Sequence, residues 1–250
     1  MARHSHFANI KRWKDKVDAQ RGKVFTVHAR LIAVAAKNGG DPSMNPTLRA
    51  AIDRAKAANV PNTNIERAIK KGTGEDKEGS IFEEVTYEAI GPGGSAFLID
   101  VITDNKNRAL LNIRTILGKN GGSLGSSGSV MWKFAKKAYL LVNIQGKDAE
   151  EAELTLIDAG ADDLAVTDEG QFEVYAAPDQ LGEVRKKVEA AGFKVEKDEL
   201  VWQAKDPLVV ADLETAQKIL KLAEALEEDE DIVRVTNDVD FDESLLPHLG

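Results

Sequence analysis

The residues best suited to chemistry in this sequence are the cations near its beginning. Residues 4–25 hold eight Lys, Arg or His side chains against two carboxylates, and Phe7 and Trp13 lie among them. Dense cations neutralise phosphates, and planar rings between them can stack on bases, so this stretch favours nucleic-acid binding. Trp13 also has helical spacing with Ile10 and Val17, which is equally typical of a residue in a helix core.

The candidate binding residues are the cations of this stretch, its tryptophan, and a later Lys-Lys pair. We predict that nucleic acid is contacted by Arg3, Lys11, Arg12, Trp13, Lys14, Lys16, Arg21, Lys23, Arg30, Lys70 and Lys71. A basic helical module can place one helix in the major groove of DNA or lie along ribosomal RNA. Composition alone does not choose between these two ligands.

The charge of the whole chain is divided unevenly. Residues 1–78 hold 16 Lys and Arg against 8 Asp and Glu, a net charge of +8, whereas residues 79–250 hold 17 against 34, a net charge of −17. Such asymmetry is typical of a polyanion-binding segment attached to an acidic body. Two other interpretations stay open at this point. The basic helices could be ordinary surface, and an acidic cleft between domains could bind a basic protein partner.

Other kinds of site find little support in the sequence. Cysteine is absent, which excludes disulfides, thiolate nucleophiles and Cys-ligated zinc and suits a reducing cytoplasm. The histidines are His4, His6, His28 and His248, and His4 and His6 lack further metal ligands nearby. Carboxylate pairs such as Glu83-Glu84, and the run at 227–232, have no predicted apolar wall to raise a pKa. We therefore expect no catalytic residue, no metal and no cofactor.

A glycine-rich stretch, "GGSLGSSGS" at 121–129, could in principle hold a phosphate. A P-loop needs a strand before it, a helix after it, and Lys followed by Ser or Thr at its end. Here a helix is predicted before the stretch and a strand after it, and the stretch contains no Lys. The sequence therefore predicts a mobile surface loop that could contact a partner.

Apolar periodicity predicts four short helices over the first 74 residues. Gly22 should break the first helix from the second, which should end at 38–40. Asn45 followed by Pro46 is typical of an N-cap and first helical residue.

The fourth helix and the segment after it carry their own signals. Thr63 and Glu66 have capping-box spacing, and Gly72 should end the helix. The polar stretch 73–80 is then predicted to be a linker.

After Ile81 the pattern becomes mixed. We expect a hairpin from 81–90 and 95–103, a helix at 106–119 and a strand at 130–134. After Lys136-Lys137 the predicted elements are strand 138–144, helix 148–158, strands 162–167 and 170–177, helix 178–191 and strand 193–204. This β-α-β-β-α-β order is the ferredoxin-like arrangement. The helix and strand that follow complete the first unit better than they extend the second.

The predicted fold class is therefore α+β with several domains. An all-α basic helical domain covers 1–78, and an α+β domain covers 79–136 plus 207–250. The ferredoxin-like α+β domain at 137–206 is inserted in it.

Long motifs along the chain resemble those of the YebC family, whose mitochondrial members include the translational activator of cytochrome c oxidase. They are "HSHFANIKRWKDKVDAQRGKVF", "NPTLRAAIDRAKAANVPNTNIERAIKKGTGE", "YEAIGPGGSAFLIDVITDNKNR" and "KNGGSLGSSGSVMWKF", followed by "FEVYAAPDQLGEVRKKVEAAGFK" and "KILKLAEALEEDEDIVRV". The resemblance implies three domains, one inserted in another, and no catalytic residues. It also implies a probable DNA-binding transcriptional regulator, although some members resemble translation factors that act on the ribosome.

The opening motif departs from the family pattern. Arg3, His6 and Phe7 stand at places that are usually Gly, Lys and Trp, and "KRWK" replaces the usual "KHRK". We predict a cytoplasmic, non-enzymatic, DNA-binding transcriptional regulator, monomeric or weakly oligomeric, with no membrane partner. The alternatives are a translation factor that binds ribosomal RNA and a protein–protein adaptor that uses the acidic interdomain cleft.

Overall fold

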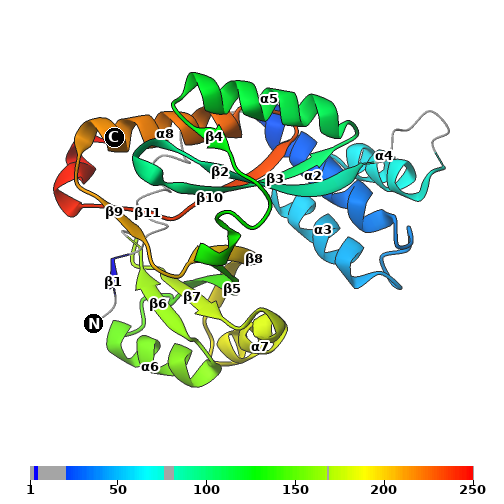
Figure 1. The fold of residues 1–250 in the computed structure, drawn as a ribbon. Coiled ribbons are helices and arrows are strands. Elements are labelled where there is room, and N and C mark those ends of the chain that lie inside the picture. Colours follow the sequence, from blue (N-terminus) through cyan, green and yellow to red (C-terminus); the bar gives the residue numbers. More distant parts are fainter. Residues whose placement is uncertain (1–2, 5–20, 76–81, 168, 250) are drawn as a thin grey trace.

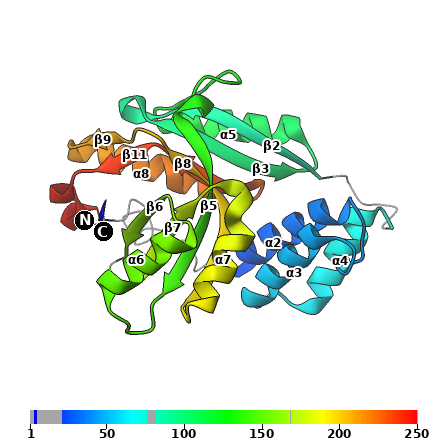
Figure 2. The ribbon, with the colours of Figure 1, turned by 90° about the horizontal axis from the view of Figure 1, so that it is seen from below.

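The computed structural model describes residues 3–4, 21–75, 82–167 and 169–249. The predicted helix of Ile10, Trp13 and Val17 lies outside these residues, as does most of the predicted linker at 73–80. The described elements surround three main hydrophobic clusters, one in a helical unit and one beside each of two sheets. The helical unit lies to one side of both sheets (Figures 1 and 2).

The helical unit consists of α2 (Arg21–Ala36), α3 (Pro46–Ala57) and α4 (Asn62–Thr73). Ile32, Leu48 and Ile65 each contribute a buried side chain to its core. Asn45 caps α3 as predicted, because its side-chain oxygen accepts the Leu48 N–H at 3.0 Å. The second predicted helix ends at Ala36, just before the Asn-Gly-Gly stop signal.

Two glycine and capping signals in this unit were misinterpreted, whereas the predicted break at Gly22 stays a prediction because the residues before Arg21 lie outside the described part. Thr63 makes no capping bond at the start of α4. Gly72 lies inside α4, which ends instead at Gly74 with φ 75°. A Cβ at Gly72 would meet the Ala33 carbonyl oxygen at 2.2 Å, so this glycine lets α4 pack closely on α2.

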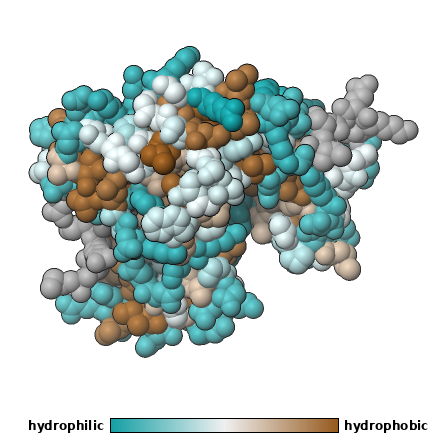
Figure 3. Space-filling view, in the orientation of Figure 1, coloured by the Kyte–Doolittle hydropathy of each residue, from teal (hydrophilic) through white to brown (hydrophobic). Residues whose placement is uncertain are grey.

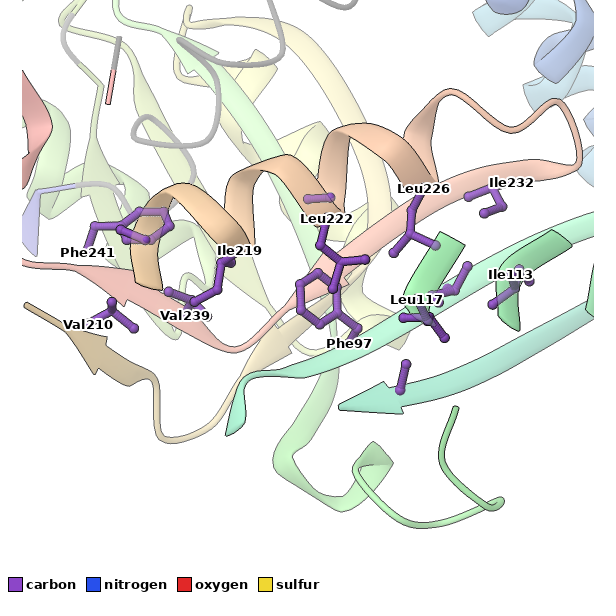
Figure 4. Packing of buried hydrophobic residues seen from close by; sticks show 14 of the residues in the cluster. Phe97, Ile113, Leu117, Val210, Ile219, Leu222, Leu226, Ile232, Val239 and Phe241 are labelled. Carbon is purple, nitrogen blue, oxygen red and sulfur yellow. The ribbon is translucent and has the colours of Figure 1, made fainter. Parts of the chain in front are cut away.

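The larger α+β unit is built on a four-stranded sheet in the order β10-β3-β2-β4. Its strands are β2 (Glu83–Ile90), β3 (Ala96–Thr103), β4 (Ser123–Leu124) and β10 (Ile232–Asn237). The helices α5 (Lys106–Lys119) and α8 (Leu213–Glu227) cover one face (Figure 1). Phe97, Leu117 and Leu222 meet between β3 and these helices (Figure 4). The predicted hairpin is confirmed, and a strand from near the end of the chain pairs with it.

The second sheet has the order β6-β7-β5-β8, with β1 (Arg3–His4) beside β6. Its elements are β5 (Phe134–Asn143), α6 (Ala149–Ala159), β6 (Asp163–Val166), β7 (Phe172–Ala176), α7 (Leu181–Ala190) and β8 (Lys194–Ala204). Leu140, Leu156, Val174 and Val184 are buried between its strands and the two helices. These elements follow in the β-α-β-β-α-β order that the sequence predicted.

The passage between the two sheets differs from the prediction. Met131–Lys133 form a short 3-10 turn (η2) where a strand was expected, and β5 begins at Phe134. Because β5 runs on to Asn143, the predicted boundary between 136 and 137 lies inside a strand. The alternation of β3 explains the tight junction. Its Phe97 faces α5 and α8, whereas its Leu98 packs with Val130 and Phe134 on the opposite face.

The remaining elements connect and close the two units. The return from β8 forms β9 (Leu208–Val210), which pairs in parallel with β11 (Val239–Phe241). Short 3-10 turns are η1 (Pro92–Gly94), η3 (Pro178–Gln180) and η4 (Glu243–His248). In the described part of the chain, every helix is too short or too polar to span a membrane.

Candidate nucleic-acid interface

The structure places the side chains of only some predicted binding residues. Lys11, Arg12, Trp13, Lys14 and Lys16 lie outside the described residues. Arg3 and Arg21 are described by their backbone alone, in β1 and at the start of α2. The remaining candidates are Lys23, Arg30, Lys70 and Lys71, and they fall into two pairs with different surroundings.

Arg30 is bound inside the protein. Its side chain is 11% exposed, and its Nη1 lies 3.0 Å from Asp231 Oδ1. The same guanidinium donates to the Glu230 carbonyl oxygen. Asp231 Oδ2 is in turn 3.0 Å from Arg108 Nη2. A buried carboxylate of the sheet unit is therefore held between guanidinium groups from α2 and α5.

Lys23 contacts the same part of the chain. We call residues 228–231, between α8 and β10, the acidic turn. The Lys23 ammonium donates to the Asp229 carbonyl oxygen at 2.8 Å. Burial lowers the pKa of Lys23, while the carboxylates of Glu227 and Asp229 act in the opposite direction. Lys23 and Arg30 thus bind the helical unit to the acidic turn. The sequence had predicted that these two side chains contact phosphate.

The other pair lies on α4, beside a cation that sequence reasoning missed. Lys70 is exposed, and the Lys71 Nζ is 4.2 Å from the centre of the Phe82 ring, a cation–π contact. Arg67 is exposed and lies one helical turn before them, so it shares their face. We call Arg67, Lys70 and Lys71 the α4 face. Their spacing of three and four residues was the signal that could have added Arg67.

Charged side chains of the helical unit and of the second sheet unit act on one another. Figure 3 shows the surface hollowed between these two parts. Burial lowers the pKa of His28, and the cations Arg54 of α3 and Lys197 of β8 lower it further. Lys197 is itself paired with Glu199 at 2.6 Å. Asp53 of α3 and Asp198 of β8 act on Arg185 of α7, so charges of both signs lie between these two parts.

The glycine-rich loop is ordered around a carboxylate. The Glu88 side chain is 4% exposed and accepts the backbone N–H groups of Gly128 at 2.5 Å, Val130 at 2.7 Å and Met131 at 2.8 Å. Burial by itself raises the pKa of Glu88, but these donors outweigh it and hold the pKa below its ordinary value. The sequence did not predict this contact, because a distant strand supplies the anion that these N–H groups bind.

Two buried tyrosines of the second sheet share a buried carboxylate. The hydroxyl groups of Tyr139 and Tyr175 lie 3.3 and 3.4 Å from the carboxylate oxygens of Glu173. Burial, followed by the negative charge of Glu173, raises the pKa of both tyrosines, so both keep their protons near neutral pH. Among the residues that the structure describes, no three His, Cys, Asp or Glu side chains are placed to hold a metal ion.

Comparison with known proteins identifies the family. The family model of the TACO1/YebC N-terminal domain matches residues 5–75, and that of the TACO1/YebC second and third domain matches residues 82–239. The chain belongs to the TACO1/YebC family. This confirms the resemblance seen in the motifs.

Relatives in the TACO1/YebC family cover the whole chain. Proteins of Halothermothrix orenii and Aquifex aeolicus, each named probable transcriptional regulatory protein, are 44% identical over 252 and 253 residues. The alignments cover 100% of this chain and 99% and 100% of the two relatives. The crystal structure of the conserved hypothetical protein Aq1575 from Aquifex aeolicus has a TM-score of 0.82 at 42% identity, covering 91% of this chain and 93% of its own. The mixed α and β fold with N-terminal helices is therefore that of the TACO1/YebC family.

Removing the carboxylate of Asp231 should weaken the contact between the helical unit and the sheet. In Asp231→Ala the buried guanidinium of Arg30 loses its counter-ion, so the free energy of unfolding should fall by about 3 kcal/mol. Urea unfolding followed by circular dichroism measures this. Asp158→Ala, at an exposed position on α6, is the matched control and should change little. Equal stability of the two variants would contradict the role of Asp231.

Replacing Glu88 by Gln should loosen the glycine-rich loop in a pH-dependent way. Near pH 7 the variant should be less stable by about 2 kcal/mol, because charge-assisted bonds to three N–H groups are lost. The pKa of Glu88 is lowered in the folded state, so its contribution is present above the ordinary value of 4.5 and lost as the pH falls through the folded value. Unfolding free energies of both proteins should therefore converge as the pH falls below 4.5. A difference that does not change with pH would contradict this.

Proposed function

We propose that this chain is a non-enzymatic nucleic-acid-binding regulator that acts on DNA in the control of transcription. The observation that carries the proposal is the set of exposed cations on the helical unit. Residues 21–75 hold ten Lys and Arg against four Asp and Glu. In the described residues, Arg67 and Lys70 have no carboxylate partner. The name that the relatives share, probable transcriptional regulatory protein, supports the same class of function.

The proposed organisation is a helical domain, an α+β domain and an inserted ferredoxin-like domain. The strand order β6-β7-β5-β8 supports the ferredoxin-like assignment, since β5 and β6 of the first β-α-β unit are separated by the antiparallel strand β7, as in a split β-α-β arrangement. The pairing of β10 with β3 supports the insertion, because the chain returns to the first sheet only after the second is complete.

The division of charge orients the molecule on a polyanion. The body after residue 78 carries a net charge of −17 and is repelled by phosphates, whereas the helical domain is attracted. Screening confines these forces to about 10 Å at ordinary salt, so only the cations nearest the ligand contribute. The α4 face is one described surface that meets these conditions, and Lys11, Arg12, Lys14 and Lys16 are proposed to extend it.

Charge reversal on the α4 face tests the proposal. In the double variant Arg67→Glu, Lys70→Glu, the affinity for duplex DNA should fall. The slope of log affinity against log salt should become shallower by about two units, one for each lost phosphate contact. Fluorescence anisotropy with a labelled duplex across a salt series measures both quantities. Lys218→Glu, Lys221→Glu on the exposed side of α8 is the matched control, since it reverses the same charge on the acidic body.

Two outcomes would count against the proposal. If the double variant on α4 behaves like the control on α8, the α4 face does not bind phosphates. If a fragment of ribosomal RNA binds much more tightly than the duplex at the same salt concentration, DNA is not the preferred ligand.

A further inference from the structure

An exposed indole ring lies at the junction of the two sheets. Trp132, in η2 between the glycine-rich loop and β5, is 66% exposed. Other large hydrophobic side chains with the same exposure in the described part, such as Leu111 and Leu154, are aliphatic. Burying a large aromatic ring is strongly favourable, so a ring left in water is a candidate for contact with a ligand.

The ring is held in place before any ligand arrives. Its Nε1 donates to the Ser129 carbonyl oxygen at 3.0 Å. The residues on both sides of Ser129 are fixed by Glu88, which binds the N–H groups of Gly128 and Val130. The segment that carries the ring follows β4 and crosses the face of the molecule turned to the viewer in Figure 1. A ring fixed in this way loses little conformational entropy when a partner packs on it.

One ammonium group is held at the backbone of Trp132. Lys205, exposed just after β8, donates its Nζ to the Trp132 carbonyl oxygen at 2.8 Å. The exposed carboxylate of Asp206 directly follows Lys205 in the chain. Lys133, beside Trp132 in the sequence, is paired with the buried Asp238.

This combination distinguishes between partners. The indole N–H is already used, so the ring offers a planar apolar face and no further hydrogen bond. The ammonium group of Lys205 is bound to the backbone carbonyl of the same residue. A stacked base with its adjacent phosphate needs both of these groups, whereas an aliphatic protein surface needs only the ring.

We propose that Trp132 is a stacking platform for an unpaired base of a single-stranded nucleic acid, and that Lys205 contacts the phosphate beside that base. This inference rests on the proposed function and narrows its ligand. The α4 face can bind any phosphate backbone, but Trp132 requires a base that is not paired inside a duplex. The ligand that satisfies both surfaces therefore contains a single-stranded segment.

Substitutions at Trp132 test the platform on the full chain. The probes are fluorescein-labelled thymidine and uridine oligonucleotides of about 12 residues and a duplex of the same length. Trp132→Ala should weaken binding of the single strands about 5- to 100-fold and leave the duplex affinity unchanged. Trp132→Phe should retain most of the affinity, because a planar ring remains. Leu111→Ala, which removes an equally exposed side chain on α5, is the control and should have no effect.

Two further measurements separate stacking from charge. Lys205→Gln should lower the salt slope for single strands by about one unit, whereas Trp132→Ala should leave the slope unchanged. The single strand should also quench tryptophan fluorescence in the wild type, and the quenching should be smaller in Trp132→Phe, in which Trp13 and Trp202 remain. Circular dichroism checks that each variant is folded.

The outcomes distinguish this inference from the proposed function. If Trp132→Ala binds single strands as the wild type does, the platform is overturned, while the result with the α4 variants still stands. If the wild type binds the duplex but no single strand, the platform is also overturned. If the wild type binds neither, both proposals fail.

Discussion

Asp231 is a buried carboxylate that joins parts of the molecule far apart in the chain. It receives Arg30 from α2 on one side and Arg108 from α5 on the other. Neither guanidinium group is near it in sequence, and Asp231 itself follows α8 in the acidic turn. Because an unpaired buried charge is costly, the three side chains hold one another in a single arrangement. The orientation of the helical unit, and with it the direction in which the α4 face points, depends on this contact.

Two other buried carboxylates do comparable work in the larger α+β unit. Glu88 holds the backbone of the glycine-rich loop, and Asp238, fully buried, accepts the Ala96 N–H at 2.7 Å and pairs with Lys133 at 2.5 Å. The bonds of Glu88 fix the loop before β5. The pair of Asp238 with Lys133 fixes the residue directly before β5. Part of the acidic charge after residue 78 is therefore structural. Most of the remaining acids lie on the surface, where their charge opposes the approach of a polyanion.

The sequence was most informative where structure is local. The hairpin of β2 and β3, the cap at Asn45 and the β-α-β-β-α-β order all follow from periodicity and turn residues within short stretches. The long motifs were specific enough to indicate the family. Gly72 shows the limit of local signals, since a glycine after two lysines is typical of a helix end, yet its cause is close contact with Ala33.

Contacts between distant residues were beyond reach for a physical reason. Cation density predicts that a surface binds phosphate, but it does not tell which cations the protein uses internally. Lys23 and Arg30 are used by the acidic turn, some 200 residues later in the chain, and their own neighbours carry no sign of this. The same applies to Glu88, whose partners lie about 40 residues away. Lys11, Arg12, Lys14 and Lys16 stay predictions.

The two proposed surfaces differ in their physical chemistry, and this gives their combination a consequence. Phosphate contacts on the α4 face release counterions and weaken steeply with salt, whereas stacking on Trp132 depends little on salt. A ligand that reaches both surfaces is held by a second contact at high effective concentration only if its length matches the distance between them. The contact of Arg30 with Asp231 joins the helical unit to the larger α+β unit. Glu88 of the same unit binds the loop that precedes Trp132, so the distance between the two surfaces is fixed. Weakening the contact between Arg30 and Asp231 would therefore reduce the affinity of ligands that reach both surfaces relative to that of shorter ligands. This would happen even if every phosphate-binding cation and the Trp132 ring were intact.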